Sequence, residues 1–403
     1  MLPGIEPRSY IYAPLGPDLF EHLKRIYAFN TRADHPTRWE VDVHCSDDPL
    51  RRMTTERPGN VVVIAGRCRN KMERIRASLD AGLNVLADKP WIIRSSELPA
   101  LEAALELAGR SGLVAYDIMT ERFEPSTIIQ RHLVNDPAVF GTPVAGSDAE
   151  PGVVIESVHH LLKTVAGVPN LRPAFFFDVA NEGAGLADVG THLIDLVPWT
   201  LFPNQALRTP QDLRIASARQ WATVMTLEQF ERVTALPGFP PELAPYVKQG
   251  RLEYNCNGEV HYQIRGIHVR LAALWNYESP AGVDLHHAVY RGTSSAVEVR
   301  QGEKEKYVPE VYVIPNGPEN RAAVLQALDA RLRRLQADYA GVASEASEGE
   351  FHIAIPDRYR VGHEAHFAQV LAQFLGYLAL PQSMPAWERP NMIAKYTVST
   401  TGS

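Results

Sequence analysis

Lys89 and its neighbours are the first residues whose types and spacing suit catalysis. The segment from Asp80 to Trp91 reads as a helix end, a glycine turn and a strand, followed by Asp88, Lys89 and Pro90. A lysine at the carboxyl end of a parallel strand lies where open α/β sheets bind their ligands. Pro90 fixes the backbone and permits a cis peptide bond, which would aim Lys89 into a cleft. A surface lysine before a turn explains this segment alone equally well.

Asp188 and His192 form the second group. They are four residues apart, so on a helix they share one face and can touch, and Asp195 lies three residues beyond His192 on that face. A carboxylate beside an imidazole orients it and holds it ready as a general base or acid near neutral pH. Gly183 and Gly185 before the pair allow close backbone approach to a ligand. A core histidine bonded to a helix-start aspartate, with no catalytic role, is the alternative.

The first third of the chain supplies the elements that would position Lys89. Short apolar runs alternate with amphipathic helices, and the run at 60–65 is apolar throughout, as expected of a parallel strand covered on both faces. The pattern predicts strands at 9–13, 39–45, 60–65, 84–87 and 113–118, and helices at 17–26, 71–81 and 96–110, with a further helix opening at Pro49. Such alternation predicts βαβ units in a right-handed, doubly wound parallel sheet.

After about residue 121 the pattern changes to strands that follow one another directly. We expect helices at 126–135, 157–166, 185–201, 319–337 and 363–377, a polar linker at 344–350, a proline-broken tail, and strands at 213–224, 252–265, 267–277, 285–291, 296–300 and 308–314. Consecutive strands predict an α+β domain with an open, mostly antiparallel sheet. We therefore expect two domains, 1–120 and 121–403, with the C-terminal helix returning to the first.

Composition excludes several classes of protein. With 403 residues, 45% hydrophobic and 22% charged, the chain has the values of a soluble globular protein. A net charge of −7 argues against nucleic acid or an anionic membrane as partner. Three widely spaced cysteines exclude a disulfide framework. The start lacks the apolar run of a signal peptide, and no apolar stretch approaches the ~18 residues of a membrane helix, so we expect a cytoplasmic protein.

Taken together, the two chemical segments resemble motifs of the Gfo/Idh/MocA oxidoreductase family. Residues 81–90 resemble the family's AGKHVLxEKP, with Asp88 in place of the glutamate, and residues 182–195 resemble GGGxLxDxGxHxxD without gaps. Between them, the Arg122–Pro125 segment followed by 141–143 resembles RFxP…GxxGxP, and residues 291–293 resemble the xGTxG turn of a later strand pair. The motifs occur in the family's order, and the resemblance runs from about residue 8 to the end.

This resemblance implies an oxidoreductase that transfers hydride between NAD or NADP and a hydroxyl of a sugar, polyol or related small molecule. Lys89 would stabilise the developing alkoxide or relay its proton. His192 would be the general base or a hydroxyl donor, and Asp188 would orient His192 or bind substrate. The resemblance also implies a homo-oligomer, formed through the large sheet.

Further binding residues are expected around these three. Those beside the cofactor would be Gly66, Arg67, Asp88, Lys89 and Pro90. Arg122 in the RFxP-like segment and Asp188 are candidates for substrate binding. Lys163, on the helix predicted together with His159 and His160, could reach the cleft as a second cation, although lysines on helix surfaces are usually solvated. No metal site is expected.

The segment before Lys89 departs from the family pattern. A nicotinamide-binding domain needs a first strand, a GxGxxG turn and a helix N-terminus whose amides hold the pyrophosphate, and no such turn occurs here. The strand at 9–13 resembles the family's second strand. We expect that the chain lacks the first strand and helix, because Pro14 and Pro17 remove amides that a degenerate phosphate loop at 13–18 would need.

Dinucleotide binding is therefore expected to be impaired. Two other functions stay open: a non-catalytic or cofactor-deficient relative that binds a sugar-like ligand, and NAD-dependent glycosidase chemistry, in which a transient oxidation permits elimination.

Overall fold

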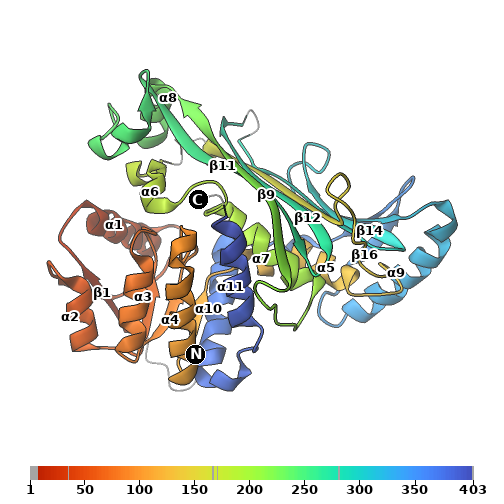
Figure 1. Cartoon of the computed structure of the whole chain (residues 1–403), viewed down its shortest axis with the longest axis horizontal. Helices are drawn as coiled ribbons and strands as arrows, with labels where there is room; N and C mark the ends of the chain where they lie inside the picture. The colour runs from red at the N-terminus through yellow and green to blue at the C-terminus, as the bar shows by residue number, and fades with distance from the viewer. Residues whose placement is uncertain (1–7, 35, 166–167, 170, 280–281, 402–403) are drawn as a thin grey trace.

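The chain folds into a lobe of parallel strands and helices beside one large open sheet (Figure 1). The computed structural model describes residues 8–34, 36–165, 168–169, 171–279 and 282–401. In the part of the chain that is described, no helix is both long and apolar enough to cross a membrane.

Two parallel sheets form the N-terminal lobe. Strand β1 (Ser9–Ala13) pairs with β2 (Val41–Cys45), and β4 (Asn84–Ala87) lies between β3 (Val61–Ile64) and β5 (Ala115–Asp117). The connecting helices are α1 (Pro17–Thr31), α2 (Pro49–Glu56), α3 (Lys71–Asp80) and α4 (Leu98–Arg110). The predicted parallel, Rossmann-like arrangement is confirmed, but among the described residues no strand hydrogen-bonds the first sheet to the second.

The core of this lobe explains why β4 is held firmly. Its residues Val85 and Ala87 are fully buried against apolar side chains that recur every three or four residues on α3 and α4. Met392 and Tyr396 of the C-terminal helix α11 (Glu388–Ser399) join the same core. The strand that ends at the predicted catalytic lysine is therefore packed from both faces.

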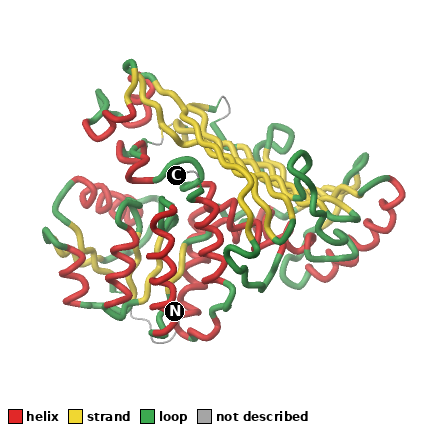
Figure 2. Tube along the Cα trace, in the orientation of Figure 1, coloured by secondary structure: helices red, strands yellow, loops and turns green. Residues whose placement is uncertain are grey.

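The second part of the chain is built on a ten-stranded sheet, which crosses the molecule as the long yellow band of Figure 2. The order is β10-β11-β12-β6-β13-β14-β15-β17-β16, with β9 also paired to β11. All pairings are antiparallel except that of β6 with β12. The strands are β6 (Val153–Leu162), β9 (Leu213–Met225), β10 (Val247–Lys248), β11 (Arg251–Ile264), β12 (Ile267–Glu278), β13 (Leu285–Arg291), β14 (Ser295–Gln301), β15 (Glu310–Pro315), β16 (Ala343–Ala346) and β17 (Phe351–Ala354); β7 (Thr164–Val165) and β8 (Val168–Pro169) pair separately.

Strand β6 corrects one prediction. The sequence predicted a helix at 157–166, but Ser157 pairs with Ala273 on β12 and with His286 on β13. Hydrogen bonding along both edges, together with the β-branched residues at the start of the segment, outweighs the helical spacing of its later leucines. The consequence for function is large, because side chains two apart on β6 now share one face.

Helices cover the sheet and return to the N-terminal lobe. They are α5 (Pro125–Val134), α6 (Val179–Glu182), α7 (Val189–Leu201), α8 (Leu227–Thr234), α9 (Arg321–Leu335) and α10 (His363–Ala379). Apolar residues of α5, α7 and α9 pack on the sheet, whereas Val370 and Phe374 of α10 pack against Leu86 and Tyr116. The proline-broken tail was a wrong prediction, since α11 is a regular helix whose Pro390 stands in the first turn, where proline is tolerated. The linker predicted at 344–350 instead carries part of β16.

Candidate functional site

Lys89 follows the end of β4, and several contacts fix the backbone around it. The Asp88 amide donates to the Ile64 carbonyl (2.8 Å), and the Lys89 amide donates to the Asp88 carboxylate (2.9 Å). The buried Lys71 ammonium donates to the Asp88 carbonyl (2.9 Å). The Lys89–Pro90 peptide is cis. The side chain of Lys89 therefore leaves a rigid strand end, which is where precise sites are built.

Asp188 is brought to Lys89 by a loop that approaches its neighbours closely. Gly183 and Gly185 both have positive φ, 90° and 54°. A Cβ on Gly183 would lie 3.0 Å from Ile93 Cγ2, and one on Gly185 would lie 2.7 Å from Gln220 Cγ. These glycines thus permit contact with other parts of the chain, and α7 begins only at Val189, later than predicted.

Lys89 and Asp188 form an ion pair in which the ammonium is mostly buried and the carboxylate is partly exposed. The ammonium donates to Asp188 Oδ1, and the two side chains are 15% and 36% exposed. Burial by itself would lower the pKa of Lys89, but the Asp188 and Asp88 carboxylates outweigh burial and raise it. Burial likewise would raise the pKa of Asp188, and the Lys89 charge lowers it instead. Both groups are therefore ionised at neutral pH.

His192 lies one turn into α7 and is held neutral. Burial, followed by the nearby Lys89 charge, keeps the pKa of His192 well below its ordinary value of 6.5. Its Nδ1 is buried without a hydrogen-bond partner among the described residues. The expected hydrogen bond between Asp188 and His192 is not found, because the Asp188 carboxylate accepts from Lys89 instead. A neutral imidazole beside a fixed ammonium can accept a proton.

Arg122 was predicted to bind substrate, but its guanidinium binds two carboxylates of the protein instead. Its side chain is 7% exposed and donates to both oxygens of Asp195 (2.6 and 2.8 Å) and of Glu388 (2.9 and 3.0 Å). Lys395 extends the cluster by contacting Asp117 (2.6 Å) and Asp195 (3.3 Å). The cluster ties the turn at Thr120–Phe123 to helices α7 and α11, so we leave Arg122 out of the substrate site.

The loop after β3 carries the two other residues predicted beside the cofactor. Gly66 is exposed with a φ of 98°. Arg67 donates to Asp18 (3.0 Å) and its guanidinium lies 4.4 Å above the Phe175 ring. The loop is therefore joined both to the start of α1 and to the segment that precedes Asp188.

Contacts of Cys68 and Lys71 join this loop to the segment before Asp188, and no sequence pattern indicated them. The Cys68 thiol donates to Glu182 (3.4 Å), and Lys71, only 1% exposed, lies 3.5 Å from Cys68 Sγ. Burial raises the pKa of Glu182 to about 7 and that of Cys68 to about 12. Burial also raises the pKa of Glu121 to about 7, against the opposing charge of Lys89. The Lys71 charge therefore acts on the weakly acidic Glu182 carboxyl, and the Lys89 charge acts on that of Glu121.

A second cluster lies along β6 and just before β13; the sequence analysis named His159 and Lys163 of this cluster but missed Ser157 and Asp284. Ser157 Oγ and His159 Nε2 are 2.8 Å apart, and His159 Nδ1 lies 2.9 Å from Asp284 Oδ2. Lys163 also donates to Asp284, and its predicted helix is in fact the end of a strand. The His159 charge contributes to the lowered pKa of Asp188. Only the two-residue spacing of Ser157 and His159 could have indicated it, because Asp284 is 125 residues from His159.

The described residues fit one end of a nicotinamide dinucleotide. Asp88, Lys89 and Gly66 lie at the carboxyl ends of β3 and β4, where Rossmann-like sheets bind ligands. At the other end, helix α1 starts after an extended Gly16 that has no side-chain cap, and Pro17 occupies its first turn. Among the residues described, no glycine-rich turn offers amides to a pyrophosphate at this helix start, so that part of the usual cradle does not fit.

Comparison with known proteins places the chain in a family. The family described as "Putative oxidoreductase C terminal domain" matches residues 129–403. A "putative oxidoreductase" of Parabacteroides merdae has 42% identity and a TM-score of 0.93, covering 97% of this chain and 89% of its own.

More distant structures share the fold alone. Levoglucosan dehydrogenase in complex with NADH and levoglucosan has 13% identity and a TM-score of 0.58, covering 98% of this chain and 88% of its own. A 3-ketoreductase from Actinomadura kijaniata, in complex with TDP-benzene and NADP, has 13% identity and a TM-score of 0.50, covering 98% and 96%. No curated protein matches the chain. By its C-terminal domain, its fold and its sequence motifs, the chain belongs to the Gfo/Idh/MocA oxidoreductase family.

Proposed function

We propose that this chain is a nicotinamide-dependent oxidoreductase acting on a hydroxyl of a sugar, polyol or related small molecule. The observation that carries the proposal is the Lys89–Asp188 ion pair near a neutral His192, at the carboxyl end of β4. The family and the fold shared with levoglucosan dehydrogenase support it.

Each of the three residues has a role that follows from its charge. Lys89 stays protonated at neutral pH, so it stabilises the negative charge that develops on the substrate oxygen. His192 is neutral and accepts the hydroxyl proton at a ring nitrogen. Asp188 holds the Lys89 ammonium in place through the hydrogen bond at Oδ1. A bound nicotinamide would supply the carbon that takes or gives the hydride, and Asp88, Gly66, Arg67 and Pro90 would help to hold the cofactor.

The cluster on β6 and β13 suits the remaining hydroxyls of such a substrate. His159 and Lys163 offer donors, and Asp284 offers an acceptor; their side chains are 18%, 26% and 20% exposed. Several hydroxyls on neighbouring carbons need this mixture of donors and acceptors. We therefore propose that Lys163, together with His159 and Asp284, binds substrate.

One observation favours a second function, that of a sugar-binding relative without redox activity. The N-terminal lobe, as far as it is described, lacks the amide cradle that would hold a pyrophosphate.

Oxidation assays distinguish the two functions. The 403-residue chain is incubated with a panel of sugars and polyols and with NAD⁺ or NADP⁺, and reduced nicotinamide is measured. Turnover with any panel member supports the oxidoreductase, whereas saturable sugar binding without turnover by either cofactor supports the relative.

The family resemblance also predicts a homo-oligomer. Sedimentation of the purified chain tests this prediction directly, since a dimer would have twice the monomer's mass of 44.8 kDa.

A further inference from the structure

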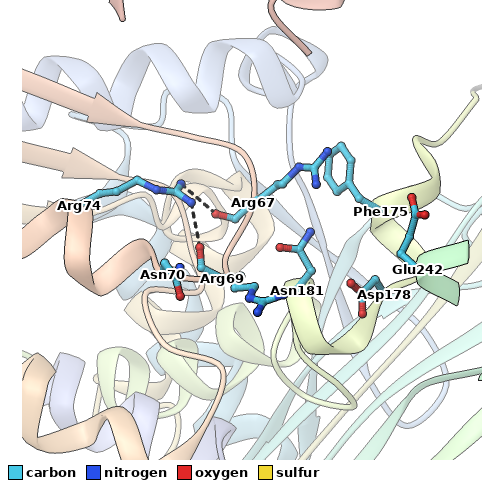
Figure 3. A pocket seen from close by; sticks show the side chains of 8 residues that line it. All are labelled: Arg67, Arg69, Asn70, Arg74, Phe175, Asp178, Asn181 and Glu242. Carbon is cyan, nitrogen blue, oxygen red and sulfur yellow. Dashed lines mark hydrogen bonds between the residues drawn. The ribbon is translucent and has the colours of Figure 1, made fainter. Parts of the chain in front are cut away.

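A cavity rich in arginine lies between the loop after β3 and the segment that precedes α7 (Figure 3). Its volume is about 340 Å³. It is lined by Arg67, Arg69, Asn70, Arg74, Phe175, Asp178, Asn181 and Glu242. The arginines gather on one wall, formed by the loop after β3 and the start of α3, whereas residues 175–181 and Glu242 form the other wall.

The guanidinium groups of the three arginines differ in how many of their N–H donors already have partners in the protein. Arg74 donates to the carbonyls of Arg67 (3.3 Å) and Arg69 (2.8 Å), so its guanidinium fixes the shape of the loop while keeping its charge. Arg67 is shared between Asp18 and the Phe175 ring, and its pair with Asp18 is half-exposed and readily exchanged. Arg69 is exposed, and no hydrogen bond of its guanidinium is found in the described part of the chain. Donors for an anion are therefore available.

Asn181 is the observation that points to a ligand. It is 5% exposed, lines the cavity, and has no hydrogen bond to its side-chain amide among the described residues. Its backbone is fully used, since its amide donates to Asp178 and its carbonyl accepts from the Arg69 amide (2.8 Å). The side-chain amide opens into the cavity, so it is available to donate to a bound polar group.

The carboxylates on the far wall restrict what the ligand can be. Asp178 already accepts from the Tyr246 hydroxyl (3.0 Å) and the Ala180 amide (3.0 Å), whereas Glu242 is exposed. A simple anion would gain from three guanidinium groups and lose to two carboxylates. A phosphate ester that also carries hydroxyls satisfies both walls, because guanidinium groups bind phosphate and carboxylates accept from hydroxyls.

We propose that this cavity binds the phosphate of a hydroxyl-bearing phosphate ester. Arg67 and Arg69 contact the phosphate, and Asn181 donates to it. The start of α3, at the uncapped Asn70, adds the positive end of a helix dipole. Phosphate binding in this cavity does not require that the proposed redox reaction take place. The phosphate can come from a nicotinamide dinucleotide, in which case these side chains stand in for the missing amide cradle, or from a phosphorylated sugar.

Calorimetric titration of the 403-residue chain tests the site. The probes are inorganic pyrophosphate, glucose 6-phosphate with glucose as its control, and NADH. The variants are Arg69→Gln and Asn181→Asp. The matched control is Arg76→Gln, because Arg76 is an exposed arginine of helix α3 that pairs with Asp80 and does not line the cavity. We expect at least one phosphate probe to bind, and Arg69→Gln and Asn181→Asp each to weaken it about tenfold or more while Arg76→Gln does not.

The outcomes separate the sources of the phosphate. Loss of NADH affinity alone assigns the cavity to the cofactor, and loss of glucose 6-phosphate affinity alone assigns it to a substrate. Absence of binding by all phosphate probes, or equal weakening by Arg69→Gln and Arg76→Gln, overturns the proposal. Thermal melting of each variant confirms folding. Lys89→Met is expected to leave pyrophosphate binding unchanged, so a failure of the redox proposal and a failure of this site are distinguishable.

Discussion

The Lys89 ammonium donates to the Asp188 carboxylate although the two residues are 99 positions apart. This contact joins the end of β4 in the N-terminal lobe to the start of α7, which packs on the large sheet. It keeps both groups ionised, and burial together with the Lys89 charge lowers the pKa of His192 against the opposing charge of Asp188.

Lys89→Met tests this pair. We expect kcat to fall about 100-fold or more, because the charge that stabilises the developing alkoxide is lost. The thermal midpoint should shift much less than in Arg122→Met, since the Asp188 left behind is 36% exposed and can be hydrated. Steady-state kinetics and thermal melting check both points. A loss of activity that merely follows a loss of folded protein would refute the catalytic role.

The pH dependence of kcat/KM should report the low pKa of His192. A neutral base is needed, and a pKa well below 6.5 means that His192 stays neutral down to pH values below that of an ordinary histidine. The rate should therefore not fall as pH is lowered until the pH is below 6.5. Measurement at constant ionic strength tests this, and Asp188→Asn serves as a comparison. An acidic limb centred at or above pH 6.5 would contradict the assignment.

Glu121→Gln should change how stability depends on pH. Burial raises the pKa of Glu121 from 4.5 to about 7, so the folded chain holds a proton that the unfolded chain releases. The contribution of protonated Glu121 to the free energy of unfolding is fully present below about pH 4.5 and is lost as pH rises through 7. The variant should therefore melt a few degrees above the native chain at pH 8 and show no such gain at pH 4.5. Glu102→Gln, at an exposed position of α4, is the control and should show no pH-dependent gain.

Arg122→Met should act on stability and leave substrate affinity unchanged. The substitution leaves Asp195 and Glu388 buried without their main partner, which typically costs about 3–5 kcal/mol. Denaturant unfolding measures this cost, and KM is determined at a temperature where the variant is folded. A large increase in KM with little loss of stability would instead support the original substrate-binding prediction.

Asp284→Asn tests the cluster on β6 and β13. It removes the charge that pairs with Lys163 and orients His159, so we expect kcat/KM to fall about tenfold or more, with most of the change in KM. His287→Gln is a matched control, because it breaks a histidine–carboxylate pair with Glu298 at an exposed position on the same strand. Equal effects of the two variants would exclude a specific role for Asp284.

Local patterns predicted the elements that carry Lys89. The run at 84–87 became β4 with the same bounds, and the helix predicted at 71–81 became α3. These predictions succeeded because buried parallel strands and amphipathic helices leave clear hydrophobic patterns. Lys89, Asp188 and His192 were found through motif spacing, and the structure brings them together.

Long-range contacts explain what sequence reasoning missed. Strand β6 was expected as a helix because its pairing partners, β12 and β13, are more than 100 residues away. Asp284 was not recognised for the same reason. Helix α11 was missed because Pro390 was interpreted as a helix breaker, although it lies in the first turn. The partners of Arg122 come from two other helices, and no local spacing indicates them.

The most direct test of the central claim is a fluorescence titration of the 403-residue chain with NADH and with NADPH. We expect saturable binding of at least one of the two nucleotides. Absence of saturable binding of both would contradict a nicotinamide-dependent reaction in this chain.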